Sequence, residues 1–238
     1  MKTLIISDIH SNIYALEAIW AKEKDCDLVL CAGDLVDWGP YPKEVIAWIQ
    51  AHGVPTVQGN HDAWVALYYR RGRSLPNPTS EERGWVHYTA SQLSEADILF
   101  LEDLPETLTF SLDGVEYGMT HLIHKQSELV SRHAFAQFRQ ERFGGAAYTR
   151  LITGHTHFQG VRQLSNAWLW LNPGSVSYRR RGDPDKTAHY IVVSSASGEN
   201  GRISLNRLAY DRRKLYTAAK VIPLGPSEQK SVESIFGE

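Results

Sequence analysis

The sequence contains very little cysteine. Its 238 residues include only Cys26 and Cys31. Two thiols cannot build a four-cysteine zinc site or a framework of several disulfides. Cys31 lies within the apolar run LVLCAGD, which favours a small buried residue over a metal ligand. A chain without a disulfide framework suits a reducing compartment, so we expect a cytoplasmic protein.

Long apolar runs and an excess of positive charge are also missing. No run approaches the roughly 20 apolar residues that cross a bilayer, and Asp8 interrupts the short apolar start MKTLIISDIH. With 25 Lys and Arg against 27 Asp and Glu, the formal net charge is -2. This balance provides no global basic field for a long nucleic acid or an anionic membrane. We therefore expect neither as a partner.

The composition that is present, with 42% hydrophobic and 22% charged residues, is typical of a globular protein. The first sixty residues alternate apolar runs of strand length with segments of helical spacing. We expect strands at 3–8, 27–34 and 54–60, and helices at 12–24 and 42–53. Such alternation of strand and helix predicts a parallel sheet covered by helices.

The rest of the chain is patterned differently. Residues 63–105 are rich in turn formers and charge and end in a capped helical pattern, so we interpret them as a lid-like helical insertion. The segment 107–120 predicts a hairpin with a tight Asp-Gly turn, and much of the later sequence predicts strands. The polar tail after Pro223 is expected to be loosely ordered. We predict one α/β domain over 1–238.

Side chains that commonly bind metals follow the ends of the predicted strands. In an open parallel sheet the carboxyl ends of the strands meet at one edge, where ligands bind. Two pairs of these residues are separated by one position, which on an extended backbone directs both side chains to the same side. The candidate donors are Asp8, His10, Asp34, Asn60, His121, His155 and His157.

This set of donors indicates the kind of ion. Carboxylates, neutral imidazoles and an amide suit borderline divalent ions such as Mn, Fe, Zn, Co or Ni, and we favour Mn. Seven donors exceed what one ion requires and suffice for two ions that share a carboxylate. Such a pair activates water and stabilises charge during in-line attack at phosphorus. The simpler explanation, that these residues only cap helices and turns, would have to hold at five strand ends.

The series SDIH, GDLVDWG, GNHD and GHTH, in that order, resembles the motifs of the calcineurin-like metallophosphoesterase superfamily. The stretches SDIHSNIYALEAI and NPGSVS are also similar to its small bacterial and archaeal phosphodiesterase-like branch. The resemblance spans roughly residues 2 to 195, and the ordered series is far more specific than any single motif. It implies a two-sheet α/β sandwich flanked by helices, with the inserted helical lid described above.

The resemblance also implies which side chains would hold two ions. The first ion would be bound by Asp8, His10, Asp34 and His157. The second would be bound by Asp34, Asn60, His121 and His155, so that Asp34 bridges the two. His124 follows His121 closely in the sequence and is an alternative to it as a ligand.

Further residues match functional positions of the family. His61 corresponds to the histidine that faces the scissile phosphate, where it would stabilise charge or protonate the leaving oxygen. Asp37 corresponds to the carboxylate that orients this histidine. The candidate substrate-binding residues are Asn60, Arg179 and Arg180, although the two arginines fit a solvated charge run equally well.

We therefore predict a dinuclear-metal-dependent phosphoesterase, in which a metal-bridging hydroxide attacks phosphodiesters, with monoesters as the second choice. Trp38 stands where protein phosphatases of this superfamily have an arginine, which disfavours a phosphoprotein phosphatase. The expected partner is a small phosphorylated substrate, nucleotides included. The alternatives are a hydrolase of dinucleoside polyphosphates or nucleotide pyrophosphates, and a non-catalytic metal-binding scaffold such as the retromer subunit of this fold.

Overall fold

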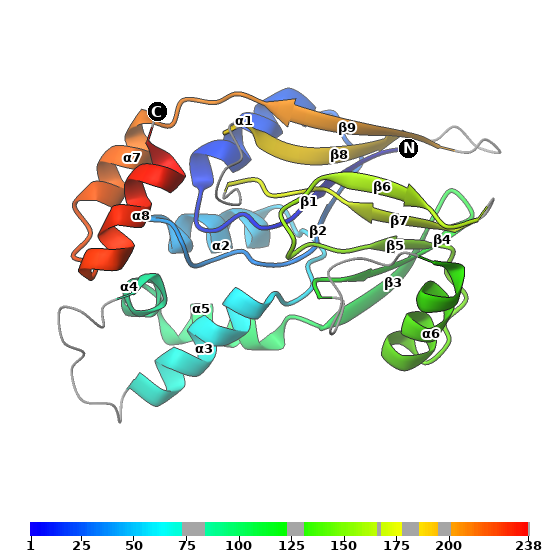
Figure 1. The fold of residues 1–238 in the computed structure, drawn as a ribbon, viewed down its shortest axis with the longest axis horizontal. Coiled ribbons are helices and arrows are strands. Elements are labelled where there is room, and N and C mark those ends of the chain that lie inside the picture. Colours follow the sequence, from blue (N-terminus) through cyan, green and yellow to red (C-terminus); the bar gives the residue numbers. More distant parts are fainter. Residues whose placement is uncertain (73–83, 123–130, 166–167, 178–185, 195–200, 238) are drawn as a thin grey trace.

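The structure is a computed structural model that describes residues 1–72, 84–122, 131–165, 168–177, 186–194 and 201–237. Two sheets lie face to face, and helices cover the outer face of each (Figure 1). The apolar layer between the sheets includes Ile5 and Leu30 from one sheet and Met119 and Leu171 from the other. The predicted two-sheet α/β sandwich flanked by helices is thus confirmed.

The first sheet has the strand order β2-β1-β8-β9. Strand β1 (Lys2–Ile6) runs parallel to β2 (Leu28–Cys31) and antiparallel to β8 (Ala188–Ser194), which pairs with β9 (Arg202–Leu208). Successive side chains of a strand point to opposite faces. Both faces of β1 are covered, because Leu4 and Ile6 pack in the helical layer while Ile5 packs between the sheets. This explains its unbroken apolar run.

The second sheet has the order β3-β4-β5-β7-β6. Strands β3 (Thr107–Leu112) and β4 (Val115–Thr120) form the predicted hairpin, and β5 (Arg150–Ile152) lies parallel to both β4 and β7 (Leu169–Asn172). Strand β6 (Gly160–Gln163) completes the edge. Strands β4 and β5 therefore end at the same edge of this sheet.

Helices from both halves of the chain cover the sheets. The outer layer of the first sheet is formed by α1 (Ile13–Glu23), α2 (Pro42–Ala51), α3 (Asn60–Gly72), α4 (Trp85–Gln92) and α5 (Glu95–Asp103). Helix α6 (Arg132–Phe143) packs on the second sheet through Phe135 and Phe138. The predicted insertion 63–105 is helical in its described part and shares the main core, and its action as a lid stays a prediction.

Two local expectations were wrong. Residues 54–60 do not form a full strand. Within them Thr56 alone makes a β-bridge, to Cys31 of β2, because the short segment turns directly into α3. The tail after Pro223 is not loosely ordered: it contains α8 (Pro226–Phe236), which follows α7 (Arg213–Lys220). Val232 and Phe236 recur one helical turn apart and pack with Trp85 in a separate apolar cluster, which holds the tail against α4.

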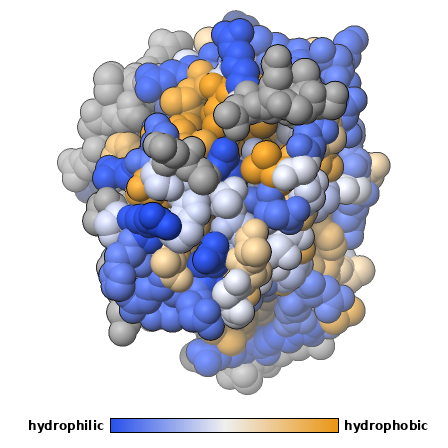
Figure 2. Space-filling view, turned by 90° about the vertical axis from the view of Figure 1, so that its right-hand side faces the viewer, coloured by the Kyte–Doolittle hydropathy of each residue, from blue (hydrophilic) through white to orange (hydrophobic). Residues whose placement is uncertain are grey.

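The surface at the opposite end from α7 and α8 is mostly hydrophilic, with hydrophobic residues gathered mainly in its upper half (Figure 2). Among the described helices, none has both the length and the apolarity needed to cross a membrane.

Removal of the Phe236 side chain should reveal how strongly the tail is held. Phe236 is only 3% exposed, so we expect Phe236→Ala to lower the free energy of unfolding by about 3 kcal/mol through lost apolar burial and a residual cavity. Urea denaturation followed by circular dichroism measures this. Val221, which is 80% exposed, provides the control, because Val221→Ala should leave stability within about 0.5 kcal/mol. Equal stabilities for both variants would contradict the packing.

Candidate metal centre

The candidate donors lie on loops that meet at one edge of the two sheets. Asp8 follows β1, Asp34 follows β2, His121 follows β4 and His155 follows β5. Backbone hydrogen bonds join these loops: Asp8 N–H donates to the carbonyl of Gly33 (2.9 Å) and Gly154 N–H donates to that of His121 (3.2 Å). The convergence expected from the ends of the strands is therefore present, although the loops come from both sheets.

The backbone that carries the donors is not extended, contrary to our expectation. Asp8 and His10 have φ of 54° and 47°, and His155 and His157 have φ of 66° and 61°. These values lie in the left-handed region, which costs non-glycine residues roughly 1–2 kcal/mol each. The paired side chains converge because of these sharp loop turns and not through strand alternation. Such local strain is typical of functional sites.

Asp8, His10 and His157 form the first donor group. The Nε2 atoms of the two histidines are 3.2 Å apart, and Nε2 of His157 is 3.1 Å from Oδ1 of Asp8. Ligands around one cation lie about 3 Å from one another when each is about 2.1 Å from the ion. The spacing of the three side chains therefore fits a single divalent ion.

Asp34, His121 and His155 form the second donor group. Asn60 joins it, because its Oδ1 lies 2.8 Å from Nδ1 of His155 and 3.1 Å from Nε2 of His121. Oδ2 of Asp34 is 3.1 Å from the same nitrogen of His121. These four residues are the set that the family resemblance implies for a second ion.

The ring orientation of His121 shows what this group can bind. Its Nδ1 is 2.6 Å from the carbonyl oxygen of Ala32, which can only accept, so Nδ1 carries the proton. In the neutral ring, Nε2 then directs a lone pair toward the oxygens of Asp34 and Asn60. Either a second proton on this ring or a divalent cation supplies the positive charge that this arrangement needs, and a bound cation would take the place of that proton.

Asp34 lies between the two groups. Its Oδ1 accepts a hydrogen bond from the backbone N–H of His61 (2.8 Å), and its Oδ2 is 3.1 Å from His121 Nε2 and 4.0 Å from His10 Nε2. Asp34 is 1% exposed, and Oδ2 accepts no hydrogen bond from the described residues. A buried carboxylate oxygen is costly without compensation, so this oxygen also fits a position beside cations.

The charges of the site agree with this geometry. Burial lowers the pKa of His10 to about 3, with the neighbouring His61 contributing, so this imidazole is neutral and able to bind a metal. Burial would also lower the pKa of His121, but the Asp34 carboxylate outweighs it and raises the pKa to about 10. Asp34 thus creates a local field that stabilises positive charge.

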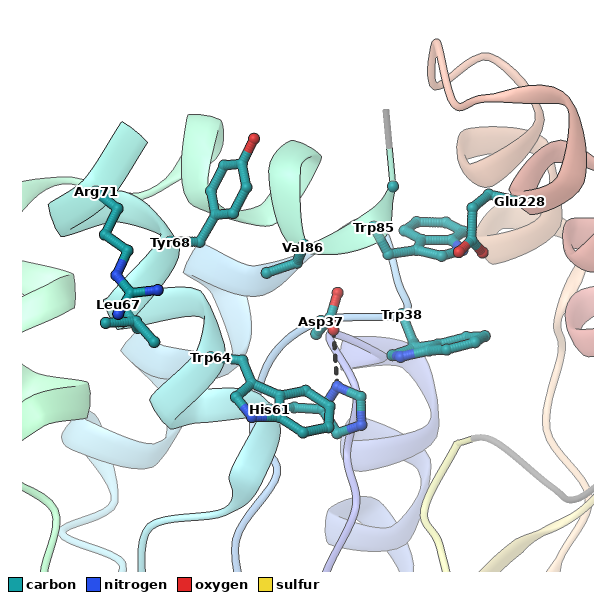
Figure 3. A pocket seen from close by; sticks show the side chains of 11 residues that line it. Asp37, Trp38, His61, Trp64, Leu67, Tyr68, Arg71, Trp85, Val86 and Glu228 are labelled. Carbon is teal, nitrogen blue, oxygen red and sulfur yellow. Dashed lines mark hydrogen bonds and ion pairs between the residues drawn. The ribbon is translucent and has the colours of Figure 1, made fainter. Parts of the chain in front are cut away.

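His61 and Asp37, the predicted catalytic pair, are in contact. Nδ1 of His61 donates to Oδ2 of Asp37 at 2.7 Å (Figure 3). Burial alone would lower the pKa of His61, but this hydrogen bond together with the charges of Asp34, Asp37 and Asp62 raises the pKa above its usual value. The His61 ring stands edge-on to His10, with centroids 5.0 Å apart, so the pair borders the first donor group. The other ring nitrogen of His61 remains for a substrate.

Sequence reasoning missed Asp62, which holds the loop that carries Asp34. Its two oxygens accept backbone N–H bonds from Gly59 (2.9 Å), Asp34 (3.0 Å), Leu35 (2.8 Å) and Val36 (3.2 Å). Burial, together with the nearby Asp34 charge, raises the pKa of Asp62 to about 6. An acid three residues after Gly59 at the start of a helix is the acidic half of a capping-box pattern, which could have revealed it.

Sequence reasoning also missed Asn172, at the end of β7. Its Nδ2 donates to the carbonyl of Gly154 (2.8 Å) and to Oγ1 of Thr156 (3.1 Å). These bonds hold the turn that carries the last two histidines. Gly154 is necessary there, because a Cβ would lie 2.1 Å from Oγ of Ser7 and 2.9 Å from Oδ2 of Asp8.

Of the remaining predicted residues, Arg179, Arg180 and the alternative ligand His124 lie outside the described residues.

Comparisons with known proteins identify the family and the fold. The family model for the calcineurin-like phosphoesterase superfamily domain matches residues 1–197. An uncharacterized protein of Methanocaldococcus jannaschii is 27% identical over 234 residues, which cover 89% of each chain. A metallophosphoesterase structure from Sphaerobacter thermophilus has a TM-score of 0.73 and 24% identity, covering 99% of both chains. A hypothetical protein of Pyrococcus horikoshii has a TM-score of 0.77 and 17% identity, covering 100% of this chain and 98% of its own.

Asp62→Asn should destabilise the protein. The asparagine side chain keeps one acceptor oxygen, but its NH2 group would face backbone N–H groups that now donate to the second carboxylate oxygen. At least one buried pair of hydrogen bonds is therefore lost, and we expect the free energy of unfolding to fall by about 3 kcal/mol. Urea titration of the metal-free protein measures this without reference to activity. Asp211→Asn removes an exposed carboxylate and is the control. A change below about 0.5 kcal/mol in Asp62→Asn would contradict the positioning role.

Proposed function

Because the chain belongs to the calcineurin-like phosphoesterase superfamily, we propose that it hydrolyses phosphodiesters with the help of two divalent metal ions, preferably Mn²⁺. The observation that carries the proposal is Asp34, a single buried carboxylate between two groups of metal-type donors. The family is one of hydrolases that act on phosphoester bonds. The phosphodiester preference, the number of ions and their identity are the parts that we propose.

The first ion would be held by Asp8, His10, Asp34 and His157, and the second by Asp34, Asn60, His121 and His155. Two such ions, when bound, would activate water as the nucleophile and neutralise charge on the phosphate oxygens. Asp62 and Asn172 keep the donor loops in position, since each bonds the backbone beside the donors. The arrangement is therefore set before the substrate arrives, which reduces the cost of ordering it.

His61 would protonate the oxygen that leaves phosphorus. The hydrogen bond with Asp37 fixes its Nδ1 and raises the pKa of its imidazole, so more of the ring is protonated near neutral pH than in a free histidine. The His61 ring lies 5.0 Å from that of His10, so a phosphate held beside the first donor group would lie within reach of this acid. A scaffold that only binds partners has no use for a hydrogen-bonded pair of a histidine acid and a buried carboxylate, which favours the enzyme.

The substrate that we propose is a small phosphorylated molecule and not a long nucleic acid, in keeping with the net charge of -2. The free cysteines Cys26 and Cys31 favour action in the cytoplasm. Hydrolysis of nucleotide pyrophosphates is the second candidate. Its additional phosphates would need cationic side chains, and it remains a prediction because the candidates Arg179 and Arg180 lie outside the described residues.

Asp34→Asn provides the main test of the metal-dependent reaction. We expect chelator-treated wild type to be inactive on bis(p-nitrophenyl) phosphate and to recover with Mn²⁺, with about two ions bound per chain by elemental analysis. Asp34→Asn should lose at least about 100-fold in kcat/KM and bind fewer ions, because the shared ligand is weakened. Full diester activity in the chelated enzyme, or in Asp34→Asn, would exclude the proposal.

His61→Gln should separate acid catalysis from metal binding. We expect its metal content to match that of wild type, while kcat falls about 100-fold for an alkyl or nucleoside ester, whose leaving oxygen needs a proton. The loss should be much smaller for a nitrophenyl ester, because nitrophenolate leaves without protonation. An equal loss with both leaving groups would instead indicate that His61 stabilises charge on the phosphate.

A further inference from the structure

A cavity of about 450 Å³ adjoins the metal centre at His61. His61 and Asp37 line it, whereas none of the seven donor side chains, all of which are described, does so. The His61 ring is 5.0 Å from that of His10 on one side and 4.9 Å from that of Trp64 on the other. The proposed leaving-group acid therefore stands between the donors and the cavity, where a leaving group would extend away from phosphorus.

Helix α3 supplies one wall of the cavity. Trp64, Leu67, Tyr68 and Arg71 all line it, with the spacing i, i+3, i+4 and i+7 of a single helix face (Figure 3). The intervening Val65 and Ala66 are buried in the main core. An apolar helix face normally packs against protein, yet Trp64 is 53% and Leu67 47% exposed. This second apolar face of α3 is therefore available to a ligand.

Indole rings dominate the rest of the lining. Trp38, on the loop after Asp37, and Trp85, at the start of α4, lie across the cavity from α3 (Figure 3). Trp38 and Trp64 flank the His61 ring edge-on, with centroids 6.2 Å and 4.9 Å away. Flat aromatic walls suit a flat aromatic ligand, since base–aromatic stacking is among the stronger contacts that such rings make.

A few polar groups add hydrogen-bonding capacity to this apolar space. Oδ1 of Asp37, whose residue is 3% exposed, accepts no hydrogen bond from the described part of the chain. Nε1 of Trp85, which is 2% exposed, likewise has no acceptor among the described residues. Glu228 of α8 adds a second carboxyl group to the lining. The Asp37 and Trp85 atoms are themselves buried, so of these three groups the carboxyl group of Glu228 is the one that a ligand meets without a side-chain shift.

The chemistry of these groups selects among possible occupants. An alkyl chain offers the indoles no flat face and the Glu228 carboxyl group no donor. A nucleobase has flat apolar faces for the indoles together with N–H donors and ring acceptors at its edge. The volume is within the range of small-molecule sites and accommodates a nucleoside.

We propose that this cavity binds the nucleobase of a nucleotide ester, so that the nucleoside is the leaving group and His61 protonates its oxygen. This inference rests on the proposed phosphoesterase function for the orientation of the substrate. Recognition of the base itself uses the aromatic cavity and does not require the metals, which allows the two to be tested separately.

Binding of uncharged nucleosides provides the test. We expect adenosine or guanosine to bind the chelator-treated full-length chain in isothermal titration calorimetry, and ribose not to bind. Trp64→Ala should weaken nucleoside binding about tenfold or more, and Trp64→Phe should retain it within about threefold, because phenylalanine still stacks. Trp64 is half exposed, so both variants should fold. Trp48, which stacks on His52 and does not line this cavity, provides the matched control Trp48→Ala.

Asp34→Asn distinguishes this inference from the proposed function. It should bind nucleosides as wild type does while losing hydrolysis. If no nucleoside binds wild type, or Trp64→Ala binds as wild type does, the nucleobase site is excluded even where diester hydrolysis holds. If nucleosides bind and depend on Trp64 while no phosphoester is hydrolysed, the base site stands and the proposed reaction fails.

Discussion

The site depends on one buried carboxylate, Asp34, placed between two sets of imidazoles. An uncompensated buried carboxylate costs several kcal/mol, and here a second one, Asp62, lies directly behind it. Asp62 is compensated by four backbone N–H groups, whereas Oδ2 of Asp34 faces His121 and His10. The arrangement concentrates negative charge that only positive charge can balance. A protonated His121 supplies part of that balance, and cations held by the two donor groups would supply the rest.

The loops hold this charge at the expense of backbone strain. Among the described non-glycine residues with positive φ, all except Asp113 lie at the site, including Asp34, Asp37 and Trp38. The strain persists because the two well-packed sheets fix where each loop begins and ends, while Asp62 and Asn172 fix the loops from behind. Stability of the sandwich is thus what permits an unfavourable local backbone, and the same strain limits how stable the site itself can become.

Helix α3 connects the parts of the site. Asn60, His61 and Asp62 lie in its first turn and face the second donor group, Asp37 and the Asp34 loop respectively. One turn later, Trp64 begins the face that lines the aromatic cavity. A single rigid element therefore sets the distance between the metal centre, the leaving-group acid and the cavity. Loop-borne groups would not keep these distances as accurately.

The order of short motifs and strand ends in the sequence was sufficient to predict the layered α/β fold and to single out the seven candidate donors and the His61–Asp37 contact, because each of these residues directly follows a recognisable apolar strand or begins a helix. Local pattern could not reveal the second apolar cluster that orders the tail, because Val232 and Phe236 find Trp85 only in three dimensions. Nor could it reveal the left-handed turns or the support from Asp62 and Asn172, which depend on contacts between distant loops. The candidate donor residues could thus be found from short stretches of the sequence, whereas the cavity beside His61 exists only because α3, α4 and α8 pack together.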